Sequence, residues 1–482
     1  MDAVNDFLSV VSGYVWGIPL IALILAVGFV LTVRTGLVQV FHLRKAIRYM
    51  FKNEDGGEGD VTSFGALCTA LSATIGTGNI VGVATAIAGG GPGALFWMEF
   101  AAFLGMATKY AEGLLAVKYR EIDSDGKVLG GPFYYIEKGM GEKWGKINWK
   151  WLAKLFAIFG MLAGILGIGT MTQINGITGA VQNFFDPDKA MVAFSIGETS
   201  FAWPTIIAGV LVAFFAALVI IGGIKRISKF SEIVVPFMAV IYFVCGIILI
   251  VCNITKIPGA IALVVKSAFC PKAVFGAAIG ITVRSAMKNG IARGIFSNEA
   301  GIGSAPIAAA AAQTKEPARQ GLVCMTGTFF DTIVICTITG LAIVITGSYI
   351  PAMDKTLVGV EVTTRAFNLG LPFNTTVSSF LLTISLVFFA FTTILGWDYY
   401  SEKCLQYLVG NKKGIILTFR ILYIAAVFVG PYLKVDFVWT LADIVNALMA
   451  FPNLVALFSL SGVVAAETKS YLEKLKNGSI KE

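Results

Sequence analysis

Long apolar stretches divide the chain of 482 residues into segments that can each cross a lipid bilayer. A transmembrane helix needs about 20 consecutive apolar residues, and eleven segments of the sequence reach this length. We expect these spans at residues 14–33, 63–89, 93–118, 151–185, 203–223, 231–253, 273–296, 318–347, 374–397, 413–433 and 437–465. Residues 259–270 are expected to form a separate short helix outside the membrane. The pattern predicts an all-α polytopic membrane protein.

Glycine and small polar residues interrupt the second span at residues 70–82. Lipid offers no hydrogen-bond partners to backbone that leaves the helix, so such a break persists only inside protein or beside a wet cavity. Secondary transporters place their ligand sites at broken helices of this kind. The alternative is a glycine-lined face that lets neighbouring helices approach closely.

Composition and charge support the same class of protein and predict its orientation. Hydrophobic residues make up 56% of the chain and charged residues 14%, whereas about a quarter of the residues in soluble domains are charged. With the N-terminus outside, 27 of the 37 Lys and Arg residues fall in inside loops or at the inner ends of the adjoining spans, and 7 fall in outside segments. Because basic residues favour the cytoplasmic side, we expect a multi-pass protein of the cell membrane whose C-terminus lies in the cytoplasm.

The order of the spans predicts two halves of opposite orientation. Without the first span, ten spans remain, which form two sets of five. Because five crossings end on the opposite side of the membrane from where they began, the second set must cross in the opposite sense to the first. Spans two and seven then begin the two halves, and the best candidate for a break in the seventh lies at residues 276–282. Discontinuous helices at matching positions in inverted halves indicate a transport site. We therefore divide the chain into an N-terminal part (1–62), two five-helix repeats (63–253 and 254–466) and a cytoplasmic tail (467–482).

Two segments on the predicted inner side are expected to pack on the membrane or on the bundle. Residues 36–51 mix apolar side chains with Arg44, Lys45 and Arg48, which is typical of an amphipathic helix lying on the inner leaflet. The longest inner loop, 119–150, contains Gly-Gly-Pro-Phe-Tyr-Tyr and is expected to fold back onto the bundle.

Three sequence blocks resemble the alanine or glycine:cation symporter family. They are Gly-Thr-Gly-Asn-Ile-Val-Gly-Val-Ala at residues 76–84, Gly-Gly-Pro-Gly-Ala-Leu-Phe-Trp-Met at residues 90–98 and Ser-Asn-Glu-Ala-Gly-Ile-Gly-Ser-Ala-Pro at residues 297–306. The resemblance runs from about residue 60 to the end. One position departs from it, because the family usually has a second Trp where this chain has Glu99.

The resemblance implies the five-plus-five inverted repeat of the leucine-transporter type, preceded here by one extra helix. It also implies sodium-coupled uptake of small neutral amino acids, alanine or glycine, by alternating access. In that fold the amides of the first broken helix meet the substrate carboxylate, here at Thr77, Gly78 and Asn79. Gln173 could reach the polar end of the substrate or could instead bond between helices. Phe275 could form a wall of the pocket, although packing is the commoner role of such a ring.

The same resemblance implies where sodium, the coupling ion, would bind. The carbonyls of Ser72 and Ile75 precede the break and would meet the ion. Span nine would supply the Phe389 carbonyl and the hydroxyls of Thr392 and Thr393. Oxygen atoms are the ligands that hard cations prefer.

An intramembrane carboxylate, Asp331, lies in the eighth span. Such groups are functional candidates by default. Asp331 could complete a sodium site with Asn79, or it could form a bridge with Arg284. We favour the bridge or an indirect role.

Two pairs of charged residues are expected to be structural. Lys109 and Glu112 stand three residues apart on one helix face and are expected to pair near the inner surface. Arg420 and Asp443 are expected to pair between spans ten and eleven.

The sequence argues against other classes of membrane protein. Its only histidine is His42, outside the spans, which excludes a Ser-His-Asp triad or a histidine metal site within the bundle. There is no Walker A motif for ATP-driven pumping. A channel remains the alternative, although channels tend to use rings of subunits or charged constrictions. Only a symporter accumulates amino acid against a gradient, so a cation-dependence assay separates the two.

Overall fold

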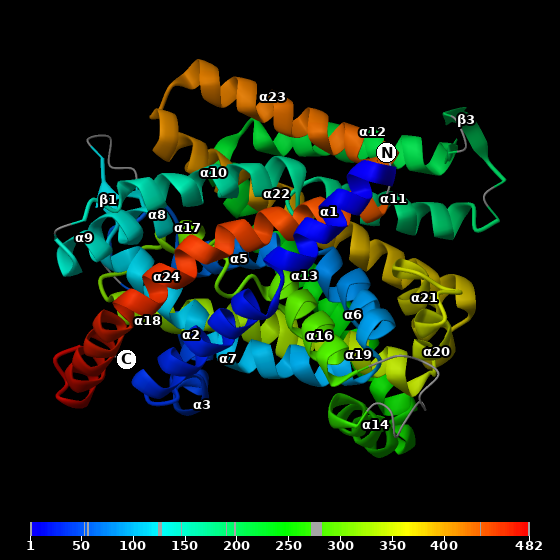
Figure 1. Cartoon of the computed structure of the whole chain (residues 1–482), viewed down its shortest axis with the longest axis horizontal. Helices are drawn as coiled ribbons and strands as arrows, with labels where there is room; N and C mark the ends of the chain where they lie inside the picture. Colours follow the sequence, from blue (N-terminus) through cyan, green and yellow to red (C-terminus); the bar gives the residue numbers. More distant parts are fainter. Residues whose placement is uncertain are drawn as a thin grey trace.

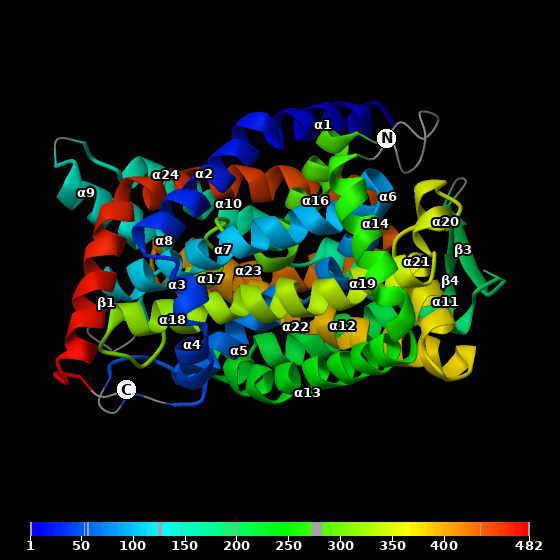
Figure 2. The same cartoon turned by 90° about the horizontal axis from the view of Figure 1, so that it is seen from below.

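The computed structural model describes residues 2–52, 54, 57–123, 128–145, 147–188, 190–196, 199–270, 282–433 and 435–480. Most of this part is helical, and the long helices run roughly along the longest axis of the molecule (Figures 1 and 2). Two small hairpins, named below, lie at opposite ends of that axis (Figure 1).

The first half of the chain begins with helices that precede the predicted repeats and continues through the first predicted repeat. Its elements are α1 (Asp2–Val15), α2 (Ile18–Arg34), α3 (Val38–Phe41), α4 (Leu43–Met50), α5 (Ser63–Thr74), η1 (Gly78–Gly82), α6 (Val83–Gly90), α7 (Gly93–Lys118), β1 (Glu121–Ile122), β2 (Val128–Leu129), α8 (Pro132–Tyr134), η2 (Tyr135–Gly139), α9 (Met140–Lys143), α10 (Lys150–Leu166), α11 (Met171–Phe185), β3 (Val192–Ile196), β4 (Thr199–Ala202), α12 (Trp203–Ile220) and α13 (Gly223–Cys252).

The second half contains the remaining long helices and several short ones. Its elements are η3 (Ile254–Lys256), α14 (Ile257–Phe269), α16 (Val283–Asn298), α17 (Ala305–Ala309), α18 (Pro317–Thr328), η5 (Phe329–Cys336), α19 (Thr337–Ile345), α20 (Tyr349–Met353), α21 (Val360–Gly370), α22 (Thr375–Val409), α23 (Lys413–Val429), η6 (Gly430–Tyr432) and α24 (Val435–Lys476).

Ten of the eleven predicted spans coincide with helices of the structure. Within the described residues, nine helical segments are long and apolar enough to cross a membrane, and the bent pair α5 and α6 raises the number to ten. The seventh span is the exception, because residues 271–281 lie outside the described residues and α16 begins at Val283. The separate short helix expected at 259–270 is α14. The chain is thus a polytopic helical membrane protein.

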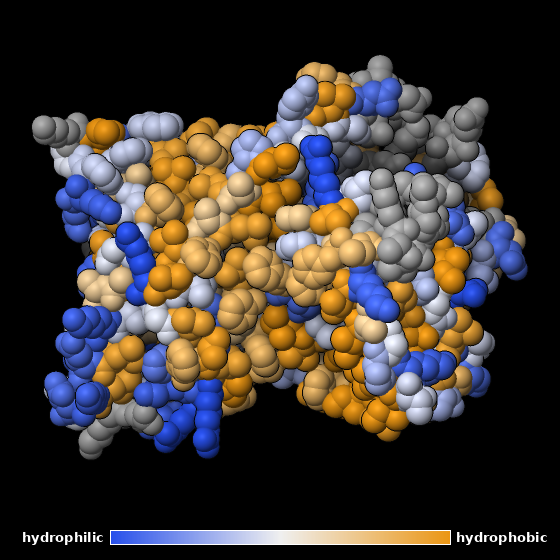
Figure 3. All heavy atoms as spheres, turned by 60° about the horizontal axis from the view of Figure 1, so that its bottom comes forward, coloured by the Kyte–Doolittle hydropathy of each residue, from blue (hydrophilic) through white to orange (hydrophobic). Residues whose placement is uncertain are grey.

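Apolar side chains cover the middle of the face shown in Figure 3, and hydrophilic ones gather towards its two ends. Large exposed apolar residues lie along the outer helices, among them Phe214 and Phe215 on α12 and Phe237 on α13. This distribution is typical of helices that face lipid, because exposing an apolar side chain to hydrocarbon costs no solvation free energy.

The N-terminal helices pack against parts of both predicted repeats. α2 lies against α7 and α24. The Trp16 indole donates a hydrogen bond to the Asp443 carbonyl at 2.8 Å, and the Arg34 guanidinium donates to the Ser461 hydroxyl at 2.9 Å. The first span is therefore joined to the last helix of the chain by polar contacts as well as by packing.

The segment 36–51 is helical, as its pattern predicted, and one face of it is buried in the protein. Tyr49 on α4 is fully buried. The guanidinium of Arg319 on α18 lies 4.3 Å from the centre of the Tyr49 ring. The Tyr471 hydroxyl donates a hydrogen bond to the Tyr49 hydroxyl at 3.2 Å.

The loop 119–150 folds back onto the bundle, which confirms that prediction. Its β1 and β2 strands pair antiparallel, with Glu121 opposite Leu129. Phe133 and Tyr135 are buried, and the Tyr135 hydroxyl donates a hydrogen bond to the Asn453 side chain on α24.

Candidate functional site

The first broken helix has its gap where the sequence predicted one. α5 ends at Thr74, and Ile75 takes an extended conformation with φ −74° and ψ 97°. The chain resumes as a π-helical turn at Gly78, and the two segments are bent by 50° relative to each other. The irregular residues 75–77 are buried, so this backbone survives at membrane depth inside protein rather than in lipid.

A second helix is broken at residues 299–304, which we did not predict from the sequence. α16 ends at Asn298 and α17 begins at Ala305. Between them Glu299, Gly301 and Gly303 have φ values of +56°, +87° and +90°, which no right-handed helix contains. The Gly-x-Gly spacing inside the third block of resemblance was the available signal.

The break expected at residues 276–282 falls almost entirely outside the described residues. Thr282 is described, and it caps the N-terminus of α16. Phe275 also lies outside the described residues, so its contact with substrate stays a prediction.

The two broken helices lie against each other. α16 packs on η1 and α6, and α17 packs on α5. At Gly78 an added Cβ would lie 3.0 Å from the Cα of Ser297. Gly78 therefore allows the backbones of the two broken helices to approach closely.

Replacing Gly303 by alanine is expected to destabilise the second break. Its φ of +90° costs an L-residue about 1–2 kcal/mol, and the new Cβ would lie 2.8 Å from the Phe156 ring and 2.9 Å from Asn453 Cγ. Gly478→Ala is the matched control, because Gly478 has φ +72° but nothing within 4 Å of an added Cβ. Thermal unfolding in detergent measures both. Equal losses of stability would show that the contacts at Gly303 contribute nothing.

Three of the five predicted sodium ligands, Ile75, Phe389 and Thr393, are joined at the first break through the Thr393 hydroxyl. The Thr393 hydroxyl donates to the Ile75 carbonyl at 3.2 Å and to the Phe389 carbonyl at 3.0 Å. The Thr392 hydroxyl donates within α22 to the carbonyls of Phe388 and Phe389, each at 3.0 Å, and to the Met238 sulfur on α13 at 3.5 Å, so no described contact joins it to the break. The fifth predicted ligand, Ser72 on α5, lies one turn before Ile75, and its hydroxyl donates a hydrogen bond to the Thr69 carbonyl. Buried oxygens from two helices therefore converge, which is the donor set that a hard cation prefers.

The amides at the first break are bonded by side-chain oxygens. The Thr77 amide donates to Gln173 Oε1 at 3.0 Å, and the Gly76 amide donates to Asn79 Oδ1 at 2.9 Å. Gln173 comes from α11 and is fixed in turn by its Nε2, which donates to the Ile168 carbonyl at 2.9 Å. The structure thus brings Gln173 to the break, together with Thr77 and Asn79.

Asp331 connects the first break to the end of α16. Its Oδ1 accepts a hydrogen bond from Asn79 Nδ2 at 2.8 Å, and its Oδ2 accepts from the hydroxyls of Ser297 and Thr332, each at 2.8 Å. Arg284 is exposed, so the expected bridge between Arg284 and Asp331 is wrong. The contact with Asn79 is present.

Two acidic residues fasten the second break to its surroundings. Glu299 accepts hydrogen bonds from the Trp397 indole at 2.7 Å and from the Ser304 hydroxyl. Glu112 on α7 accepts from the Gly301 amide at 3.1 Å and from Asn453 Nδ2 at 2.7 Å. Sequence reasoning missed Glu299 and Asn453, because nothing in their local sequence indicates which helices they will contact.

The expected pair between Lys109 and Glu112 is not a direct one. Both residues are buried on one face of α7, but Lys109 Nζ makes no hydrogen bond to any described residue. The carboxylate of Glu112 is turned instead to the backbone of Gly301 and to Asn453.

The expected pair between Arg420 and Asp443 is wrong. Arg420 lies against the end of α22 and binds Glu402, with Nε 2.6 Å from Oε2. Asp443 lies against α16 and binds Arg293 at 2.5 Å. Helix packing offers each residue a nearer partner than the one that sequence order suggested.

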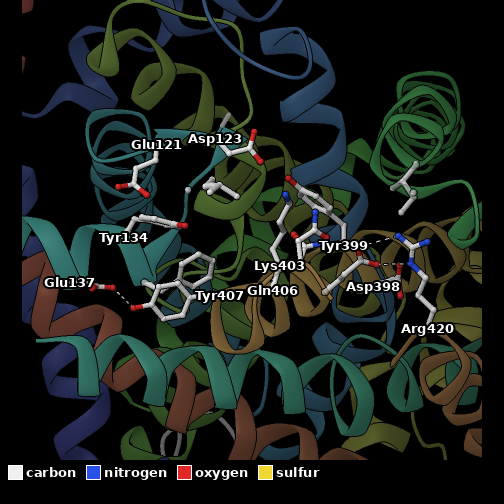
Figure 4. A pocket seen from close by; sticks show the side chains of 18 of the residues that line it. Glu121, Asp123, Tyr134, Glu137, Asp398, Tyr399, Lys403, Gln406, Tyr407 and Arg420 are labelled. Carbon is white, nitrogen blue, oxygen red and sulfur yellow. Dashed lines mark hydrogen bonds and ion pairs between the residues drawn. The ribbon is translucent and has the colours of Figure 1, made fainter. Parts of the chain in front are cut away.

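A polar cavity of about 690 Å³ lies beside the end of α22 (Figure 4). Asp398, Arg420 and Tyr407 line it, and Tyr407 donates a hydrogen bond to Glu137 across it. Burial raises the pKa of Tyr134, on the loop side of the cavity, to about 12. The cavity shares no residue with either break, so it is separate from the candidate site.

A broken helix inside an apolar bundle, with buried oxygens from a second helix at the gap, is typical of secondary transporters. The family model for the sodium:alanine symporter family matches residues 1–482. The chain belongs to this family, whose members are transporters rather than enzymes and use sodium as the coupling ion.

Relatives match the chain along nearly its whole length. It is 47% identical over 479 residues to the sodium/alanine symporter AgcS of Methanococcus maripaludis, covering 98% of this chain and 99% of the relative. An uncharacterised transporter of Haemophilus influenzae is 50% identical, with coverage of 98% and 97%. A putative sodium/proton-dependent alanine carrier, YrbD of Bacillus subtilis, is 36% identical, with coverage of 98% and 93%.

Proposed function

We propose that this chain is a symporter that couples the entry of sodium to the uptake of alanine or glycine. The observation that carries the proposal is the Thr393 hydroxyl, which joins the Phe389 carbonyl on α22 to the Ile75 carbonyl at the first break. A sodium ion placed among these oxygens, with Thr392 and Ser72 as further ligands, would link α22 to α5. Occupancy of that site would therefore set the geometry of the break.

The amino acid is proposed to bind beside the same break. Its carboxylate would take the backbone amides of Thr77, Gly78 and Asn79, near the start of η1, where the positive end of the helix dipole favours an anion. The Gln173 side chain, which holds the Thr77 amide in this structure, would adjust to the ligand. Phe275 is proposed to close the apolar side of the pocket.

Sodium and amino acid are proposed to bind cooperatively and to cross by alternating access. Because the two sites share residues 75–79, sodium orders the amides that the substrate needs. Linkage then requires the amino acid to raise sodium affinity by the same factor. The five-plus-five inverted repeat would allow one bundle to rock against the other, opening the site first outside and then inside.

Uptake of labelled alanine and glycine into proteoliposomes tests the proposal. An inward sodium gradient is expected to drive accumulation above the outside concentration, and an equal potassium gradient is expected to drive none. Labelled glutamine serves as the control for substrate size. Equilibration without accumulation would indicate a channel and would contradict the proposal.

Opposite labelling of the two ends tests the orientation. The β3–β4 hairpin, which contains Ser200, and the C-terminal end of α24, which precedes Ser479, lie at opposite ends of the molecule (Figures 1 and 2). In a background without the exposed Cys252 and Cys270, Ser200→Cys is expected to react with an impermeant maleimide from outside intact cells. Ser479→Cys is expected to react only after the cells are opened. Labelling of Ser479→Cys in intact cells would reverse the predicted orientation.

A further inference from the structure

An apolar groove of about 910 Å³ runs along α12 on the outside of the helical bundle. Its walls come from α11, α12, α13 and α22, and every residue that lines it is apolar. On the α12 wall, Ile207, Leu211 and Phe215 are each about half exposed. Because α12 is one of the candidate membrane spans, the groove opens to the hydrocarbon of the bilayer.

The length of the groove suits the acyl chain of a lipid. Its lining extends along α12 from Trp203 to Val219, which is about 24 Å at 1.5 Å per residue and approaches the hydrocarbon thickness of about 30 Å. An unfilled groove loses the dispersion contacts of its walls. Acyl chains are the material that surrounds a membrane helix, so they can fill the groove and restore these contacts.

The end of the groove on the predicted cytoplasmic side adjoins exposed basic residues. Leu218 lines this end, and its carbonyl accepts a hydrogen bond from the Arg226 guanidinium at 2.8 Å. Lys229 and Phe230 follow Arg226 by three and four residues on the same face of α13, and Phe230 lines the groove. Arg226 and Lys229 are exposed, and neither forms an ion pair with a described residue.

The charge at this end favours an anionic occupant. Residues 218–231 contain no Asp or Glu, so no acidic residue of this segment neutralises Arg226 and Lys229. Basic pockets between helices at the cytoplasmic membrane surface attract anionic lipid headgroups. A helix from a second copy of the chain could fill the apolar groove, but it would not explain the two cations at its end.

We propose that the groove binds one anionic phospholipid, with its acyl chains along α12 and its phosphate at Arg226 and Lys229. The inference concerns a lipid site outside the transport pathway. It depends neither on the coupling ion nor on the amino acid that the protein carries.

The bound lipid would contact two helices that also hold the candidate transport site. From α22, Phe391 lines the groove two residues before Thr393, and its ring packs on the Phe230 ring with centres 5.8 Å apart. From α11, Ile177 lines the groove one turn after Gln173. The lipid would therefore support these two helices from the side that faces the membrane.

Native mass spectrometry of the purified full-length protein, titrated with phosphatidylglycerol or with phosphatidylcholine of the same chains, tests the inference. The wild type is expected to bind one phosphatidylglycerol more tightly than phosphatidylcholine. Arg226→Gln with Lys229→Gln is expected to bind phosphatidylglycerol roughly 25-fold more weakly, about fivefold for each charge removed, with phosphatidylcholine unchanged. Lys469→Gln with Lys476→Gln is the matched control, because it removes two exposed charges from α24. Equal affinity of the wild type for both lipids, or equal losses in the two double variants, would overturn the inference.

A pair of tryptophan variants tests the apolar part of the site. Leu211→Trp places a large ring in the groove and is expected to weaken the binding of both lipids. Val210→Trp is the control, because Val210 is also about half exposed but lies outside the groove lining, and it is expected to bind lipid as the wild type does. Equal binding by the two variants would overturn the inference. A wild-type dimer that Leu211→Trp separates would assign the groove to a second copy of the chain and would also overturn it.

Discussion

Thr393→Ala is expected to raise the sodium concentration that half-saturates alanine uptake by roughly tenfold or more, since loss of even an indirect metal contact costs 10–100-fold. Thr393 is the side chain that reaches from α22 to the Ile75 carbonyl at the break. Its loss removes one proposed ligand and the only described hydrogen bond between that carbonyl and α22. Uptake measured at a series of sodium concentrations gives the half-saturation value.

Two variants make the Thr393 result specific. Thr393→Ser keeps the hydroxyl and is expected to restore most of the sodium dependence. Thr418→Ala removes an exposed hydroxyl that likewise donates to the carbonyl four residues earlier, at 3.0 Å on α23, and is expected to change nothing. An unchanged half-saturation value in Thr393→Ala would remove α22 from the sodium site.

Gly76→Ala is expected to weaken alanine binding by roughly tenfold or more while the protein still folds, because broken buried hydrogen bonds cost about 1–3 kcal/mol each. An added Cβ would lie 2.6 Å from the Thr393 hydroxyl and 2.8 Å from Gln173 Oε1. Both atoms are ends of side chains that can move aside. The variant therefore displaces the contacts of the site and leaves the backbone in place. Calorimetric titration with alanine in sodium measures the loss.

Gly78→Ala and Gly179→Ala are the comparison variants, because an added Cβ would lie close to backbone atoms at Gly78 and would meet nothing at Gly179. At Gly78 the new Cβ would lie 3.0 Å from the backbone of Ser297, so the cost is expected to be seen as lower thermal stability. At Gly179 on α11 nothing lies within 4 Å, and alanine is expected to be neutral or slightly stabilising in the helix. If Gly76→Ala bound alanine with wild-type affinity, the proposed site at the first break would be wrong.

The spans could be predicted from the sequence because their signal is local. A run of about 20 apolar residues is visible without knowledge of its neighbours, and ten such runs are helices here. The second break could not be found in this way. Its backbone depends on Gly301 and Gly303 at positive φ, and the charged α16 before it resembles an interrupted span.

The candidate site was predictable where a motif or a family resemblance marked it. The glycine-rich motif at residues 70–82 predicted the break at residues 75–77, and the family resemblance predicted that Thr393 and Ile75 lie together. The partners of Arg420, Asp443 and Lys109 do not, because a partner depends on how helices distant in sequence pack together. The same limit applies to Glu299, whose bond to Trp397 spans nearly 100 residues of chain.

The position of α2 joins the two halves of the described chain. Its contacts with α7 on one side and α24 on the other tie a helix of the first half to the last helix of the second. α7 in turn packs against α16 and α18, so the contacts of α2 continue to the helices on both sides of the second break. A truncation that begins at residue 63 is therefore expected to lower the stability of the remaining bundle, because it removes the packing of α2 on α7 and α24 together with the hydrogen bonds of Trp16 and Arg34.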